Sequence, residues 1–182
     1  MKIKKVFHLL CVLGFFVWWL QSCDPPMSYS NIPEIHFKSL VIEDRIDDPT
    51  LGNLLKYVIL TFSFIDGDGD IGVSPQDVDS ISRIYYTWYQ KLPDQRYEPY
   101  QFEDGSITNS SAIPYSSVMD KSEAQNKILK GSIEIVMDML RNTPKGVDTM
   151  RIEFFIVDRA RNESNPELTP DFSILNTYGK VE

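Results

Sequence analysis

The chain has 182 residues, and its 26 acidic and 18 basic side chains give a formal net charge of −8. Such an acidic chain repels nucleic acids and anionic lipid head groups, whereas cations and neutral molecules remain candidate ligands. Its two histidines are too few for a histidine-rich zinc site.

Residues 1–22 have the pattern of a signal peptide. Three lysines near the start precede an almost uninterrupted apolar run over residues 6–20, shorter than the roughly 20 apolar residues of a membrane-spanning helix. The run ends in the letters LQSC, which resemble the lipobox of bacterial lipoproteins. The resemblance implies a lipid on Cys23 and an anchored protein of the cell envelope, on the periplasmic or the surface side of the outer membrane. The alternative is an ordinary secretory signal peptide with an incidental cysteine.

The mature chain is expected to form one domain behind a short tether. Residues 23–33 contain three prolines and several small polar side chains, which keep a segment extended and solvated. About 160 residues remain after the signal peptide, enough for a single domain with a sizeable core. Because Cys11 is removed and Cys23 carries the lipid, residues 34–182 must be stabilised by that core without a disulfide.

Seven segments of the domain are predicted to be β-strands, since they are rich in β-branched and aromatic residues and are separated by turn-forming ones. They are residues 34–43, 54–65, 81–92, 96–102, 127–140, 149–157 and part of 168–175. The third and fourth segments have the spacing of a hairpin, and the polar residues 103–111 after them are expected to be a connection. The sequence therefore predicts an all-β fold, an antiparallel Ig-like β-sandwich of about seven strands.

The third segment leaves a choice between core and ligand surface. A period of two places Trp88 on one face and Tyr85 and Tyr89 on the other. A buried tryptophan on the third strand is a feature of immunoglobulin-like domains, so packing is the favoured role of these aromatic residues. The alternative is an exposed surface that stacks on sugar rings, formed by Tyr85, Tyr89, Tyr97 or Tyr100.

The letters IDGDGDIG at residues 65–72 form a candidate calcium site directly after the second segment. Asp66, Asp68 and Asp70 alternate with glycines, so their oxygens can converge while the backbone curls tightly, as suits the irregular oxygen shell of calcium. They match the first three ligand positions of the EF-hand loop, but Ile71 replaces its glycine and a strand precedes it. Three carboxylates this close repel one another unless a cation is bound. The alternative is a solvated Asp-Gly turn.

Asp158 is the fourth candidate ligand. It begins the letters DRARNESN at residues 158–165, directly after the strand segment that ends at Val157. In an immunoglobulin-like sandwich this loop and the loop after the second strand lie at the same end, so Asp158 and Asn162 would add oxygens to the site. Alternatively, Asp158 pairs with a neighbouring arginine or caps its own turn.

Together these segments resemble a group of short lipoproteins from the Bacteroidetes lineage. The group carries a strand followed by D-x-D-G-D-I-G, an aromatic-rich strand, an N-K-x-I-x-G-x-I segment and a closing D-R-A-x-N-x-S-N. This chain has FSFIDGDGDIG at residues 62–72, NKILKGSIEI at 126–135 and FIVDRARNESN at 155–165. The resemblance implies an outer-membrane lipoprotein with an Ig-like domain, and it supplies no substrate.

Catalysis has little support in the sequence. His36 is the only histidine after the signal peptide, and neither a cysteine nucleophile nor a G-x-S-x-G elbow is present beside it. We therefore expect a non-enzymatic, lipid-anchored extracytoplasmic binding or assembly module with a calcium-stabilised loop, whose partner is another envelope protein or a glycan. The alternative is a carbohydrate-binding lipoprotein that uses the tyrosines.

Overall fold

The chain folds into β-strands in a computed structural model that describes residues 29–46, 54–72, 82–102, 104–113, 128–139, 148–174 and 178–181. The strands are β1 (Glu34–Ile46), β2 (Leu54–Asp66), β3 (Arg83–Lys91), β4 (Tyr97–Pro99), β5 (Thr108–Ala112), β6 (Leu129–Met139), β7 (Thr149–Val157), β8 (Glu167–Leu168), β9 (Phe172–Ser173) and β10 (Tyr178–Val181). The signal peptide, Cys23 and the start of the tether lie outside the described residues. Within those residues, no helix has the length and apolar character needed to cross a membrane.

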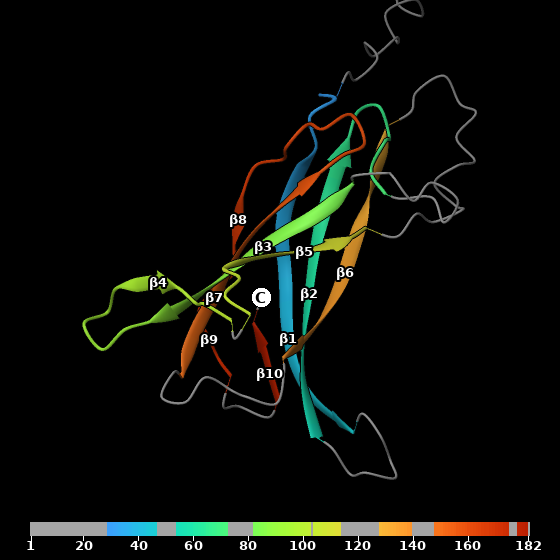
Figure 1. The fold of residues 1–182 in the computed structure, drawn as a ribbon. Helices are drawn as coiled ribbons and strands as arrows, with labels where there is room; N and C mark the ends of the chain where they lie inside the picture. Colours follow the sequence, from blue (N-terminus) through green and yellow to red (C-terminus); the bar gives the residue numbers. More distant parts are fainter. Residues whose placement is uncertain are drawn as a thin grey trace, which may run out of the picture.

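The strands form two antiparallel sheets. One has the order β10-β1-β2-β6, and the other has the order β4-β3-β7-β8 with β5 also beside β3 and β9 also beside β7. β2 thus lies between β1 and β6 while β3 pairs with β7 (Figure 1), which matches the A-B-E and C-F neighbours of an immunoglobulin-like sandwich. The predicted all-β antiparallel sandwich is confirmed.

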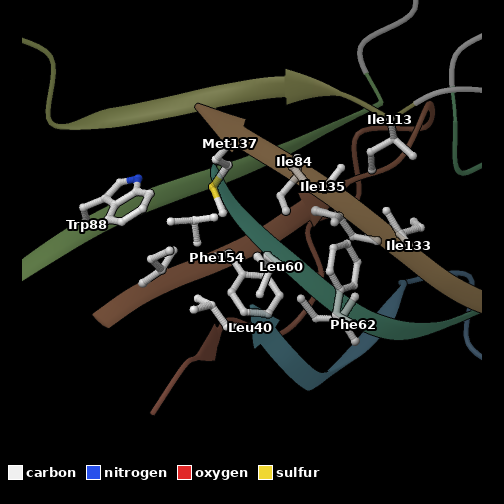
Figure 2. Packing of buried hydrophobic residues seen from close by; sticks show 14 of the residues in the cluster. Leu40, Leu60, Phe62, Ile84, Trp88, Ile113, Ile133, Ile135, Met137 and Phe154 are labelled. Atoms are coloured by element: carbon white, nitrogen blue, oxygen red, sulfur yellow. The ribbon is translucent and has the colours of Figure 1, made fainter. Parts of the chain in front are cut away.

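The core lies between the two sheets because alternate residues of each strand are apolar. Phe62 of β2 and Phe154 of β7 are fully buried, and their ring centroids are 5.3 Å apart across the interface between the sheets (Figure 2). Trp88 is 3% exposed and makes an edge contact with Phe172 at 5.9 Å. The prediction that Trp88 faces the core is confirmed.

Three strands differ from the prediction. β5 forms within the polar stretch that was expected to be a connection, because it pairs with β3 through its backbone and through a 2.9 Å hydrogen bond between Thr87 and Thr108. The last predicted strand is interrupted at Thr169, whose hydroxyl accepts a hydrogen bond from the Ile152 N–H at 2.9 Å, so that only the short β8 and β9 form. β10 was not predicted, and it pairs with the second half of β1.

The ends of several strands meet at one end of the sandwich. The end of β2 pairs with the starts of β1 and β6, and the end of β7 pairs with the start of β3. The loops after β2 and β7, residues 66–72 and 158–165, both lie at this end, at the top of Figure 1. We call these two loops the acidic pole. The β3–β4 hairpin lies toward the opposite end, because β4 pairs with the last residues of β3.

Candidate metal site

Three aspartates converge at the acidic pole. Asp66 is the last residue of β2, Asp158 directly follows β7, and Asp70 lies in the loop between β2 and β3. Each offers a carboxylate oxygen, and these oxygens all lie within 4.8 Å of one another. Asp66 and Asp158 are fully buried, and Asp70 is half-buried. Side chains separated by almost ninety residues in the sequence thus share one small volume.

The loop after β2 curls so that its own backbone binds Asp66. The Asp70 N–H donates to Asp66 Oδ2 at 2.8 Å, and Gly69, which permits the curl, has a φ of 69°. A left-handed backbone at this position favours glycine, which has no Cβ to clash with the neighbouring carbonyl. The alternation of aspartate and glycine in the sequence therefore has a conformational basis.

The second loop holds Asp70 from the other side. The Ala160 N–H donates to Asp70 Oδ2 at 2.9 Å, and Arg159 donates to the Asp70 carbonyl oxygen through its N–H at 3.3 Å and its Nε at 2.9 Å. These contacts place the two loops side by side, as expected for an immunoglobulin-like strand order.

Asp158 also caps its own turn. Its Oδ1 accepts a hydrogen bond from the Asn162 N–H at 2.7 Å, and its Oδ2 accepts one from Asn162 Nδ2 at 2.8 Å. The expectation that Asp158 reaches the loop after β2 and the alternative that it caps a turn therefore both hold. Asn162 presents its amide nitrogen to Asp158, so it acts there as a donor and not as an additional oxygen ligand.

Three carboxylate oxygens at the pole remain unsatisfied. Oδ1 of Asp66, Asp68 and Asp70 are each buried without a hydrogen-bond partner among the residues that the structure describes. Buried polar atoms are nearly always hydrogen-bonded, and burial of an unpaired charge is more costly still. Asp66 and Asp70 also belong to the group whose carboxylate oxygens lie within 4.8 Å of one another, an arrangement that a bound cation stabilises.

The pKa values of two of these aspartates are raised, as expected for carboxylates that are buried close to one another. Burial, together with the charges of Asp68 and Asp70, raises the pKa of Asp66 to about 7, although the hydrogen bond from the Asp70 N–H lowers it. Burial also raises the pKa of Asp70, together with the charges of Asp158 and Asp68, while the Ala160 N–H and Arg159 lower it. Without a cation, the pole therefore favours a proton on Asp66 near neutral pH.

The ligand chemistry of the site fits a hard cation. Asp66, Asp70 and Asp158 can each supply a carboxylate oxygen, and Asp68 lies beside this group and adds negative charge. Calcium accepts six to eight such oxygens in irregular geometry and completes its shell with water, whereas magnesium requires a nearly ideal octahedron. Hard oxygen donors also disfavour the softer transition metals.

The four candidate sugar-stacking tyrosines are partly buried. Tyr85 stacks on Phe155 with centroids 5.3 Å apart and rings inclined by 14°, and Tyr100 packs against the core. Arg151 Cζ lies 3.6 Å from the ring centroid of Tyr97 and 5.8 Å from that of Tyr89. These contacts occupy ring faces on which a sugar would stack, so they favour packing as the role of the tyrosines.

Two contributors to the pole were not predicted from the sequence. Asn165 joins the second loop to β1, since its Oδ1 accepts from the Ile35 N–H and its Nδ2 donates to the Ile35 carbonyl oxygen, both at 2.9 Å. The carbonyl oxygen of Ser30 accepts a hydrogen bond from the Gly67 N–H at 2.9 Å. A backbone carbonyl leaves no signal in the residue types of a sequence, so only the folded chain reveals the second contact.

We compared the chain with models of known protein families, with curated proteins and with solved structures. None of the three comparisons finds a match.

Proposed function

We propose that this protein is a lipid-anchored, extracytoplasmic β-sandwich of the outer membrane that acts as a non-enzymatic binding or assembly module with a calcium-stabilised pole. Cys23 carries the lipid in this proposal, on either side of the membrane. Asp66, Asp70 and Asp158 hold the ion with Asp68 beside them, and the bound ion stiffens the two loops of the acidic pole. The partner is another envelope protein or a glycan.

One observation carries the calcium part of the proposal. Carboxylate oxygens from two loops lie within 4.8 Å of one another, and the fully buried Asp66 has an oxygen without a partner among the described residues. A solvated Asp-Gly turn would instead keep its carboxylates in water, where their repulsion is weak and each oxygen is hydrated. The burial of Asp66 and Asp158 therefore supports the metal interpretation over the turn.

Direct titration tests this proposal. We expect calorimetric titration of calcium into the chelator-treated mature protein to give one ion per chain, with magnesium binding at least tenfold more weakly because of its stricter geometry. Terbium, which prefers the same oxygen ligands, gives an independent optical readout. A chain that takes up neither calcium nor terbium at millimolar concentration would lack the proposed site.

The anchor has its own test. Replacing Cys23 by alanine removes the only thiol to which the proposed lipid can be attached, so the protein is expected to move from the membrane fraction to the soluble fraction of cells that express it. The measurement is an immunoblot of fractionated cells, with wild type and a Cys11→Ala variant as controls. Membrane association that persists in the Cys23 variant would refute the anchor.

Carbohydrate binding is the weaker proposal. Among the four candidate sugar-stacking tyrosines, Tyr100 packs against the core, and Arg151 Cζ lies 3.6 Å from the ring centroid of Tyr97. A glycan-binding site built on these rings would first have to displace those contacts.

A further inference from the structure

The end of the tether lies on the acidic pole. The Gly67 N–H, next to Asp66, donates to the Ser30 carbonyl oxygen at 2.9 Å. The contact is so close that a Cβ built on Gly67 would lie 2.4 Å from that oxygen and 2.6 Å from the Tyr29 carbonyl oxygen. No side chain fits between this loop and the tether, so the position accepts only glycine while the tether stays in place.

A second contact connects the tether to the other loop of the pole. Asn162 Nδ2 donates to the Asn31 carbonyl oxygen at 3.3 Å and to Asp158 Oδ2 at 2.8 Å. One amide group thus bridges the tether and a candidate metal ligand. The tether is connected through Gly67 to the neighbourhood of Asp66 and through Asn162 to Asp158.

A third contact holds the tether from β6. Lys130 Nζ lies 3.8 Å from the ring centroid of Tyr29 and donates a hydrogen bond to its hydroxyl. A cation over an aromatic face is attracted to the ring, and at an exposed site this attraction is modest. This contact does not involve either loop of the acidic pole, so it can be altered without changing a candidate metal ligand.

We infer that residues 29–33 are a latch whose docking on the acidic pole is coupled to the ion. The inference rests on the calcium site of the proposed function. An ion held by Asp66 and Asp158 fixes the Gly67 N–H and the Asn162 amide, which are the two groups that bind the tether. By thermodynamic linkage the docked tether in turn raises the affinity for the ion by the same factor. Calcium then controls whether the tether is docked on the domain or is free of it, and so how rigidly the domain is connected to its anchor.

Replacing Gly67 by alanine tests the coupling. The backbone conformation of Gly67 is one that residues with side chains also adopt, so an alanine there does not strain the loop itself. Its Cβ would instead occupy the space that the tether now fills. In the lipidated mature protein in detergent, we expect calcium to slow amide exchange of residues 30–32 at least tenfold in wild type and to have no such effect in Gly67→Ala. The variant is also expected to bind calcium about tenfold more weakly, within the usual range of coupling between two sites.

Two further variants make the experiment decisive. Gly131→Ala is the matched control, because its Cβ would meet only the Phe64 ring, at 3.2 Å, and it should leave both the exchange of residues 30–32 and the calcium affinity unchanged. Lys130→Gln weakens the latch from outside the metal site, so it should speed exchange of residues 30–32 and lower calcium affinity a few-fold. It also provides the test if Gly67→Ala does not fold.

The outcomes separate the latch from the site itself. Calcium binding by wild type with no change in the exchange of residues 30–32 would overturn the latch and leave the calcium site standing. Unchanged affinity in both Gly67→Ala and Lys130→Gln would overturn the coupling as well. A wild-type protein that binds no calcium would overturn both proposals.

Discussion

Replacing Asp66 by asparagine is expected to raise the melting temperature of the calcium-free protein at pH 8 and to abolish the further rise that calcium produces in wild type. The amide nitrogen would take the position of Asp66 Oδ1, which is buried without a partner in the described structure, next to the carboxylate of Asp68. It would replace a repulsion by a hydrogen bond, while the remaining oxygen keeps the bond from the Asp70 N–H. The same change removes a charged ligand from the proposed calcium site.

The size of the calcium effect follows from mass action. At a concentration one hundred times the dissociation constant, a ligand that binds only the folded state stabilises it by about 2.7 kcal/mol. For a protein of this length that corresponds to roughly 5–10 °C in melting temperature. Wild type should show this rise and Asp66→Asn should not, as measured by thermal unfolding after chelation and then with excess calcium.

A matched control separates the effect of losing the proposed metal ligand from the effect of losing one negative charge. Glu98→Gln removes an exposed carboxylate from β4, which pairs with the end of β3 far from the acidic pole, so its calcium response should equal that of wild type. If Asp66→Asn keeps the full calcium response, Asp66 does not bind the ion. If it lowers the stability of the calcium-free protein, the repulsion at the pole is not the dominant effect there.

The calcium-free protein is expected to lose stability as the pH rises from 5 to 8. The pKa of Asp66 is raised from 3.8 to about 7 in the folded chain, so between these values the folded state binds more protons than the unfolded state. Stability falls with pH wherever that is so, and the loss is complete above the folded pKa. With about 1.4 kcal/mol per pKa unit, the fall in melting temperature is on the order of 10 °C.

Calcium should cancel this loss, because the ion takes the place of the proton. Its affinity should rise through pH 7 as Asp66 ionises, and the calcium-saturated protein should show a nearly flat melting temperature from pH 6 to 8. Melting curves with and without chelator at each pH measure both effects, and Asp66→Asn should lack the pH dependence. A calcium-free wild type that is equally stable at pH 5 and pH 8 would show that Asp66 carries no raised pKa.

The sequence predicted which loops form the site, but it did not predict that Asp66 is buried there. Asp158 could be assigned to the same end as Asp66 because the order of apolar strands fixed which loops meet. Burial of Asp66 was not predictable, since a run of aspartate and glycine has the composition of a solvated turn. It arises because β1 and β6 flank the end of β2 and the loop after β7 covers the remaining side.

The errors in the strand prediction have a common physical cause. β5 carries the residues Thr-Asn-Ser-Ser-Ala, and β10 has the four residues Tyr-Gly-Lys-Val, so neither has the apolar pattern by which strands are recognised. Both form at the flank of a sheet, where backbone pairing with β3 and with β1 supplies the stabilisation. Patterns of hydrophobicity identify the strands that build a core and miss those that only extend a sheet.

If Cys23 carries a lipid, the path of the tether across the acidic pole also sets the orientation of the domain relative to the membrane. Tyr29 follows Cys23 by six residues, a distance that the chain spans with at most about 20 Å. A lipid on Cys23 would thus keep the acidic pole close to the bilayer, while β2, with its 13 residues, carries the opposite end about 40 Å farther out. The end of β1 and the start of β2, which pair at that opposite end, would then be the part of the domain that an approaching partner meets first (Figure 1).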